Sequence, residues 1–164
     1  METLNREYLR SVLFGIENSL ISTVGLIAGL SVGVVDNNKV VVLGASVAIV
    51  IEAVAMGVGE YLSDDAVQAL DKIKRHPDNA LLSGFYMMLS GSLAGLIPLS
   101  PVLVFDYPSS LFASIVAALA ALFFLGYIKG KVLRTSPFKG GAKILIVGGL
   151  ATGVGVVAGL IFRV

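Results

Sequence analysis

The chain of 164 residues contains no cysteine, no tryptophan and a single histidine. The lack of cysteine excludes disulfides, thiolate metal sites and thiol redox switches. Charged residues make up only 14% of the chain, against about 25% in an average soluble domain. The net charge of +1 argues against nucleic acid as a partner. No nucleophile lies beside a base and no histidine lies in a long apolar run, so we expect neither an enzyme nor a resident cofactor.

Long apolar runs dominate the sequence. The chain is 56% hydrophobic, with a mean hydropathy of +0.91. A helix that spans a bilayer needs about 20 mostly apolar residues. Five runs qualify, at about 11–35, 40–62, 80–99, 108–128 and 141–162. They predict an all-α, polytopic membrane protein with five transmembrane helices per protomer. Because the runs use nearly the whole chain, we interpret residues 1–164 as a single transmembrane domain, and we expect it in the plasma membrane.

The distribution of basic residues predicts the orientation. Ten of the twelve Lys and Arg residues lie in the N-terminal tail, the second connection and the region after the fourth run. By the positive-inside rule, these three regions are cytoplasmic. The N-terminus is then in the cytoplasm and, after five spans, the C-terminus is on the other side.

Three carboxylates interrupt the apolar runs. Glu17 lies in the first run, and Glu52 and Glu60 lie in the second. A carboxylate within a bilayer is costly unless it faces a cavity, a partner or a cation, and such residues commonly serve ion or proton transport. Glu52, Met56 and Glu60 follow one another at intervals of four residues, so they lie near one face of the second helix.

These residues and Asn18 offer ligands for a divalent cation. Carboxylate and amide oxygens suit Mg²⁺, Ca²⁺ or Mn²⁺, and a methionine sulfur shifts the preference toward softer ions such as Fe²⁺. We therefore predict a metal site made from the residues Glu17, Asn18, Glu52, Met56 and Glu60. Because carboxylates also bind protons, loading and release of such a site can be coupled to protonation.

Other interpretations remain open for single residues. Glu60 begins a polar stretch and is equally compatible with a residue at the membrane boundary, while Met56 is compatible with ordinary packing. Glu17 is compatible with an ion pair to Arg10. For the whole chain, the alternatives are a small proton-coupled organic-cation exporter and a non-transporting membrane scaffold. The exporter would favour an aromatic cage around its cation, and the chain has no tryptophan.

Several segments together resemble the vacuolar iron transporter family. FGIENSLISTVGL at 14–26 is similar to the family's G-x-N-D-G-L-x-S-T, and EAVAMGVGEYLS at 52–63 is similar to S-M-x-x-G-E-Y-x-S. GLIPLSP at 95–101 matches G-x-x-P-L-x-P, and LGYIKG at 125–130 and VGGLA at 147–151 resemble the last two spans. The resemblance covers nearly the whole chain in order.

The resemblance implies a homodimer with its pathway between the copies, which also suits a bundle of only five helices. It implies export of Fe²⁺ or Mn²⁺ from the cytoplasm in exchange for protons, the metal being substrate. Met56 matches the family's intramembrane methionine ligand, whereas Asn18 stands where the family has aspartate. Iron-transporting members carry a glutamate-rich cytoplasmic domain where this chain has only residues 63–79.

Overall fold

The computed structural model describes residues 2–34, 37–70 and 79–163. Within these ranges the chain forms five helices and no strand. The helices are α1 (Glu2–Gly33), α2 (Asn38–Leu70), α3 (Ala80–Val104), α4 (Ser109–Val132) and α5 (Pro137–Ile161). Each contains a segment that is long and apolar enough to cross a membrane. The prediction of an all-α integral membrane protein with five spans is confirmed.

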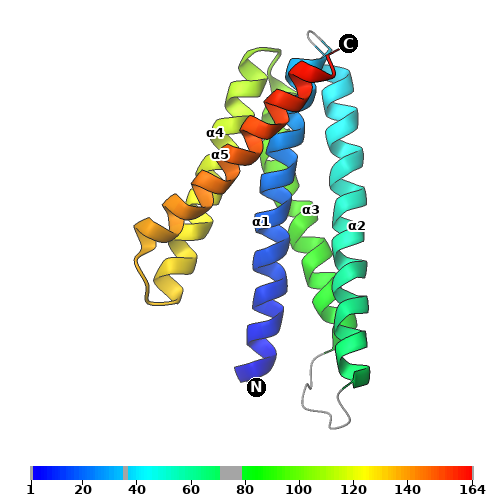
Figure 1. Cartoon of the computed structure of the whole chain (residues 1–164), viewed down its shortest axis with the longest axis vertical. Helices are drawn as coiled ribbons and strands as arrows, with labels where there is room; N and C mark the ends of the chain where they lie inside the picture. The colour runs from blue at the N-terminus through cyan, green and yellow to red at the C-terminus, as the bar shows by residue number, and fades with distance from the viewer. Residues whose placement is uncertain (1, 35–36, 71–78, 164) are drawn as a thin grey trace.

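The two ends of the chain lie at opposite ends of the bundle (Figure 1), as an odd number of spans requires. Which end faces the cytoplasm stays a prediction from the count of basic residues.

All five helices are longer than the apolar runs predicted; α4, for example, continues to Val132, and α5 begins at Pro137. α1 begins at Glu2 and α2 continues to Leu70, while α3 ends at Val104 rather than near residue 99. Apolar content marks only the part of a helix that lies in hydrocarbon, and the polar turns beyond it stay helical. In α3, Pro98 and Pro101 lie inside the helix. Proline removes one backbone hydrogen bond. Within a membrane no water is available to bond the neighbouring backbone groups, so they keep their hydrogen bonds within the helix.

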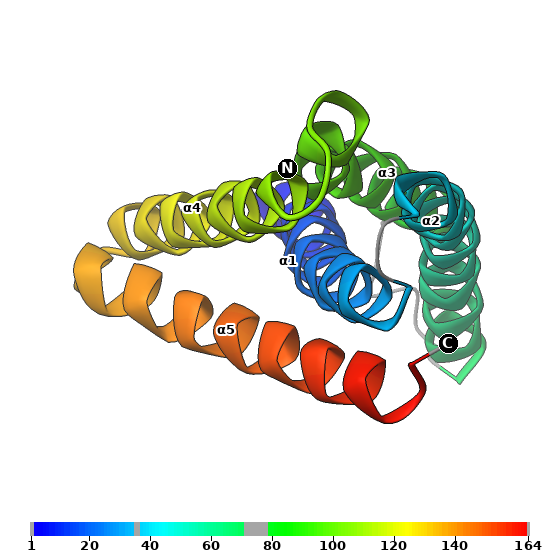
Figure 2. The same cartoon turned by 90° about the horizontal axis from the view of Figure 1, so that it is seen from above.

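α1 is the central helix, with a helical pair on either side of it (Figure 2). It contacts all four other helices, whereas α2 pairs with α3 and α4 pairs with α5. Apolar side chains of α1, α2 and α3 form the larger core, in which Ile27, Ile49 and Leu99 are almost fully buried. A second core centred on Leu20 and Leu122 joins α1 to α4. The polar residues of α1 are therefore placed between two different helical pairs.

Glycines bring α1 and α5 into backbone contact. Gly25, Gly29 and Gly33 face Ala151, Gly155 and Gly159 along the two helices. A Cβ atom on Gly29 would lie 2.8 Å from the carbonyl oxygen of Gly155. Small residues at intervals of four allow this close approach.

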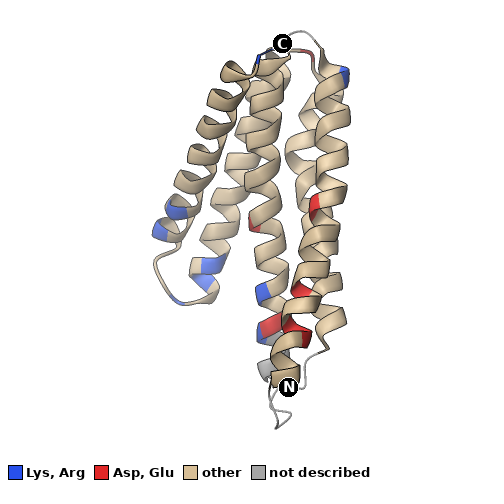
Figure 3. Ribbon diagram, turned by 45° about the vertical axis from the view of Figure 1, so that its right-hand side comes forward, with Lys and Arg blue, Asp and Glu red and all other residues tan. Residues whose placement is uncertain are grey.

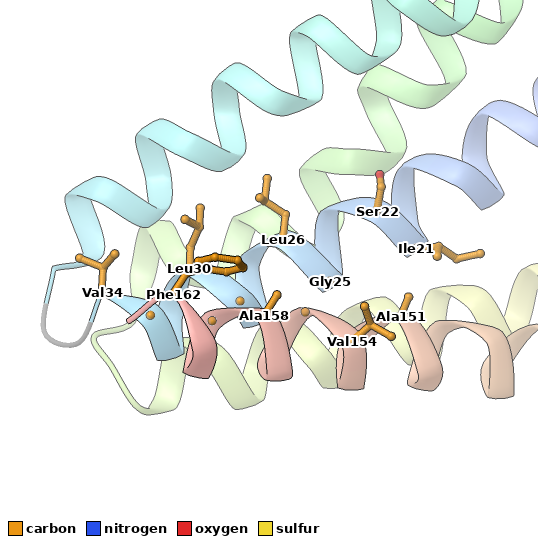
Figure 4. A pocket seen from close by; sticks show the side chains of 14 residues that line it. Ile21, Ser22, Gly25, Leu26, Leu30, Val34, Ala151, Val154, Ala158 and Phe162 are labelled. Carbon is orange, nitrogen blue, oxygen red and sulfur yellow. The ribbon is translucent and has the colours of Figure 1, made fainter. Parts of the chain in front are cut away.

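Beside this contact runs an apolar groove of about 730 Å³. Ser22 lies at one end of it, and Val34 and Phe162 lie at the other (Figure 4).

Candidate metal site

Three of the predicted site residues meet between α1 and α2. The Asn18 side-chain nitrogen Nδ2 donates to Glu52 Oε1 at 2.7 Å and contacts Met56 Sδ at 3.0 Å. Ser22 Oγ donates to the other carboxylate oxygen of Glu52 at 2.5 Å. The amide nitrogen thus stands between a carboxylate oxygen and a thioether sulfur, the position that a cation shared by these two ligands would take.

Helical spacing and one glycine build this polar cluster, which consists of Asn18, Ser22, Glu52 and Met56. Asn18 and Ser22 are four residues apart on α1, as are Glu52 and Met56 on α2, so each pair shares a helix face. On α3, a Cβ atom at Gly91 would lie 2.8 Å from the Met56 methyl carbon. Gly91 therefore leaves the room that the Met56 side chain occupies.

Ser22 and Gly91 contact Glu52 and Met56 but were not among the predicted site residues. The four-residue step from Asn18 to Ser22 is a signal in the sequence, but the role of Gly91 depends on how α3 packs against α2.

Glu60 lies at a separate place nearer the end of the bundle. Eight residues separate it from Glu52, which is about 12 Å along a helix. Glu60 Oε1 accepts from Ser11 Oγ at 2.7 Å and from Arg10 Nη2 at 2.9 Å. Arg10 also lies 3.8 Å from Asp64. Only 13% of the Glu60 side chain is exposed. The sheltered carboxylate therefore already holds a cationic side chain, and it cannot share one coordination sphere with Glu52.

Glu17 lies on a different side of α1 from Asn18. Its Oε1 accepts from Lys129 Nζ on α4 at 2.8 Å. Successive residues of a helix are about 100° apart, and α1 separates α4 from α2, so Glu17 and its neighbour Asn18 contact different helices. The alternative pairing of Glu17 with Arg10 is wrong, because Arg10 pairs with Glu60 instead.

The polar cluster offers a divalent cation one carboxylate, one thioether, one amide and one hydroxyl. Among the described residues, no three His, Cys, Asp or Glu side chains converge to hold a metal. A single copy therefore supplies one formal negative charge at this place. Rotation of the Asn18 amide would turn its oxygen, a hard ligand, toward the position that its nitrogen now takes.

The polar cluster also lies near the outer surface of the bundle. Glu52 and Met56 are half-buried, while Ile51 beside them is 63% exposed and Ala55 is exposed. A carboxylate at this depth is stable only when protein, water or a cation covers it. One copy of the chain leaves that cover incomplete.

The fold and this cluster define an integral membrane protein with a polar site between its spans. The family model described as the VIT family matches residues 9–75 and 65–160. The chain belongs to the VIT family, and the resemblance seen in its motifs is confirmed.

Proteins from plants are similar to this chain in sequence. "Vacuolar iron transporter homolog 1" of Arabidopsis thaliana is 29% identical over 161 residues, which cover 90% of this chain and 80% of that protein. "Vacuolar iron transporter 2" of Oryza sativa subsp. japonica is 35% identical over 80 residues, which cover 48% of this chain and 32% of that protein. The match to the first relative therefore covers most of both proteins. The match to the second covers about half of this chain and about a third of that relative.

Proposed function

We propose that this protein transports a divalent transition metal, Fe²⁺ or Mn²⁺, out of the cytoplasm in exchange for protons. The observation that carries the proposal is the meeting of Glu52 and Met56 around a single amide nitrogen inside the spans. A carboxylate paired with a thioether favours transition ions over Mg²⁺ or Ca²⁺. The plant relatives, one named as a homologue of a vacuolar iron transporter and the other as a vacuolar iron transporter, support the same substrate class.

Each residue of the polar cluster has a distinct role in the proposal. Glu52 supplies the charge, Met56 supplies the soft ligand, and the Asn18 amide turns its oxygen to the arriving ion. Protonation of Glu52 would remove the charge that holds the metal, so proton binding and metal release exclude each other at this carboxylate. Such competition at one site is the simplest basis for exchange.

The other two predicted ligands act away from this point. Glu60 lies between the Arg10 end of the bundle and the polar cluster, and the Arg10 guanidinium must move before a metal can bind there. Glu17 becomes a ligand only when Lys129 releases it.

The proposal includes a homodimer. The polar cluster is half-buried and flanked by exposed apolar side chains of α2. A second copy across this face would shield the carboxylate from lipid and would double the number of ligands around the pathway. The names of the relatives refer to the vacuole and give no support to the plasma membrane expected from the sequence. The proposed direction, out of the cytoplasm, does not depend on which membrane holds the chain.

The test is metal uptake into proteoliposomes under a pH gradient, with Fe²⁺, Mn²⁺, Co²⁺, Zn²⁺ and Ca²⁺ compared and internal pH recorded. We expect entry of Fe²⁺ or Mn²⁺ with movement of protons in the opposite direction, and no entry of Ca²⁺. Glu52→Gln should reduce the flux to the level of empty vesicles. Asp65→Asn, which changes an exposed carboxylate on the same helix, should leave the flux unchanged.

If the folded protein moves none of these metals, the proposal is contradicted. The organic-cation exporter or the non-transporting scaffold would then be the favoured function. Equal flux in the Glu52→Gln variant and the unchanged protein would contradict the site assignment alone.

A further inference from the structure

A second cavity lies between α1, α4 and α5, on the far side of α1 from the polar cluster. Its volume is about 370 Å³. Polar side chains of Glu17, Lys129, Thr135 and Lys143 line it, together with apolar ones such as Ile144. This basic cavity plays no part in the proposed metal site, apart from sharing Glu17.

The charges in the basic cavity do not cancel. Glu17 and Lys129 neutralise each other at 2.8 Å. Among the described residues, no carboxylate lies within ion-pair distance of Lys143. Nor does the nearby chain supply one, since residues 107–164 contain no Asp or Glu. The basic cavity therefore carries one net positive charge, which a singly charged anion would balance.

The basic cavity lies near the turn that joins two membrane-spanning helices, α4 and α5. Lys129 lies three residues before the end of α4, and Lys143 lies six residues after the start of α5. The two lysines are thus within about 5 and 9 Å of the turn between the helices. Basic residues gather at this end of the α4–α5 pair (Figure 3). Further from the turn, Ile144 and Val147 continue the lining with apolar surface.

The start of α5 adds to the positive potential. Its cap residue, Ser136, makes no side-chain hydrogen bond to the helix, so the first amide groups of α5 lack that acceptor. The positive end of the helix dipole then lies on the same side as the two lysines.

We propose that the basic cavity binds the headgroup phosphate of an anionic phospholipid. Lys143 and Lys129 hold the phosphate, and one acyl chain lies along Ile144 and Val147 toward the membrane interior. The positive-inside rule explains why lysines are abundant at this end of the bundle. It does not explain why two of them line a cavity between helices that is polar near the turn and apolar deeper in the bilayer. Basic cavities between spans are suited to anionic headgroups. The inference does not rest on metal transport.

The experiment is native mass spectrometry of the full-length protein after exchange from mixed vesicles of phosphatidylcholine and phosphatidylglycerol. We expect one phosphatidylglycerol to be retained per copy in preference to phosphatidylcholine. Lys143→Gln should weaken this retention on the order of fivefold, as expected for loss of one lysine near an anionic headgroup. Lys139→Gln removes an exposed lysine of the same helix that does not line the basic cavity, and it should retain the lipid.

A second variant changes the binding in the opposite direction. Glu17→Gln frees Lys129 and raises the net charge of the basic cavity, so it should strengthen retention of phosphatidylglycerol. Equal losses in Lys143→Gln and Lys139→Gln would overturn the proposal in favour of diffuse surface attraction. Displacement of the lipid by inorganic phosphate at millimolar concentration would overturn the lipid as occupant and identify a free-anion site.

Discussion

At the scale of single residues, the side chain that organises the polar cluster is Asn18. One amide nitrogen contacts both the Glu52 carboxylate and the Met56 sulfur. The amide carries no charge, so a divalent cation in its place would meet only the single charge of Glu52. The family pattern has an aspartate at this position, which would provide a second charge. Asn18 is therefore the residue at which this chain most clearly differs in the electrostatics of its proposed site.

Replacing Asn18 with aspartate tests this difference. In Asn18→Asp we expect the dissociation constant for Mn²⁺ to fall by at least about tenfold, because a second carboxylate a few ångströms away adds more than 1.4 kcal/mol at an intermediate dielectric constant. Without metal, repulsion between the two carboxylates should lower the thermal stability. The measurements are calorimetric titration and thermal unfolding of purified protein with and without Mn²⁺.

Asn18→Ala is the control, since it removes the amide without adding charge. It should not bind Mn²⁺ more tightly than the unchanged chain. A gain of equal size in both variants would show that the amide merely obstructs the site, and the electrostatic argument would fail.

At the scale of helices, the contact between α1 and α5 depends on the absence of side chains. A Cβ atom on Gly155 would collide with the backbone carbonyl of Gly25, and neither backbone can move aside cheaply. Gly153, two residues earlier and on another face of α5, has nothing within 4 Å of its Cβ position. At nearly the same depth, α5 therefore contains one glycine with no room for a Cβ atom and one with ample room.

We expect Gly155→Ala to destabilise the protein by roughly 1–3 kcal/mol, the usual cost of overpacking. Gly153→Ala should be neutral or slightly stabilising, because alanine is the better helix former. Denaturant titration in detergent, followed by the loss of helical signal, measures both. Equal stability of the two variants would show that α1 and α5 are not in backbone contact.

At the scale of the whole molecule, the face of α2 beside the polar cluster is exposed in a single copy. Ala55 lies one turn after Glu52 and is exposed, near the middle of its helix. Ala120 is also exposed, near the middle of α4, on the other side of the bundle. If a second copy covers the polar cluster, these two alanines will differ in what surrounds them.

The chain contains no cysteine, so a single introduced thiol reports on one place alone. We expect Ala55→Cys to form a disulfide-linked dimer under mild oxidation in the membrane, and Ala120→Cys to remain monomeric on a non-reducing gel. Cross-linking of Ala120→Cys with none at Ala55→Cys would place the dimer contact on α4 and contradict a pathway between the copies at α2.

The sequence by itself determined the number of spans, since a continuous apolar run of about 20 residues crosses hydrocarbon as a helix, which satisfies its own backbone hydrogen bonds. It also determined that Glu52 and Met56 share a face, because a step of four residues is a property of the helix alone. The polar ends of α1 and α2 were beyond the same reasoning, since apolar content does not report how far a helix extends past the hydrocarbon.

Only the tertiary structure decided which helix each polar face meets. Glu17 and Asn18 are neighbours in sequence, yet one pairs with Lys129 on α4 and the other with Glu52 on α2. Arg10 pairs with Glu60, fifty residues away, rather than with the nearer Glu17. The physical reason is that local geometry sets angles around one helix axis, whereas the partners across that axis depend on where close glycine contacts and apolar cores place the other helices.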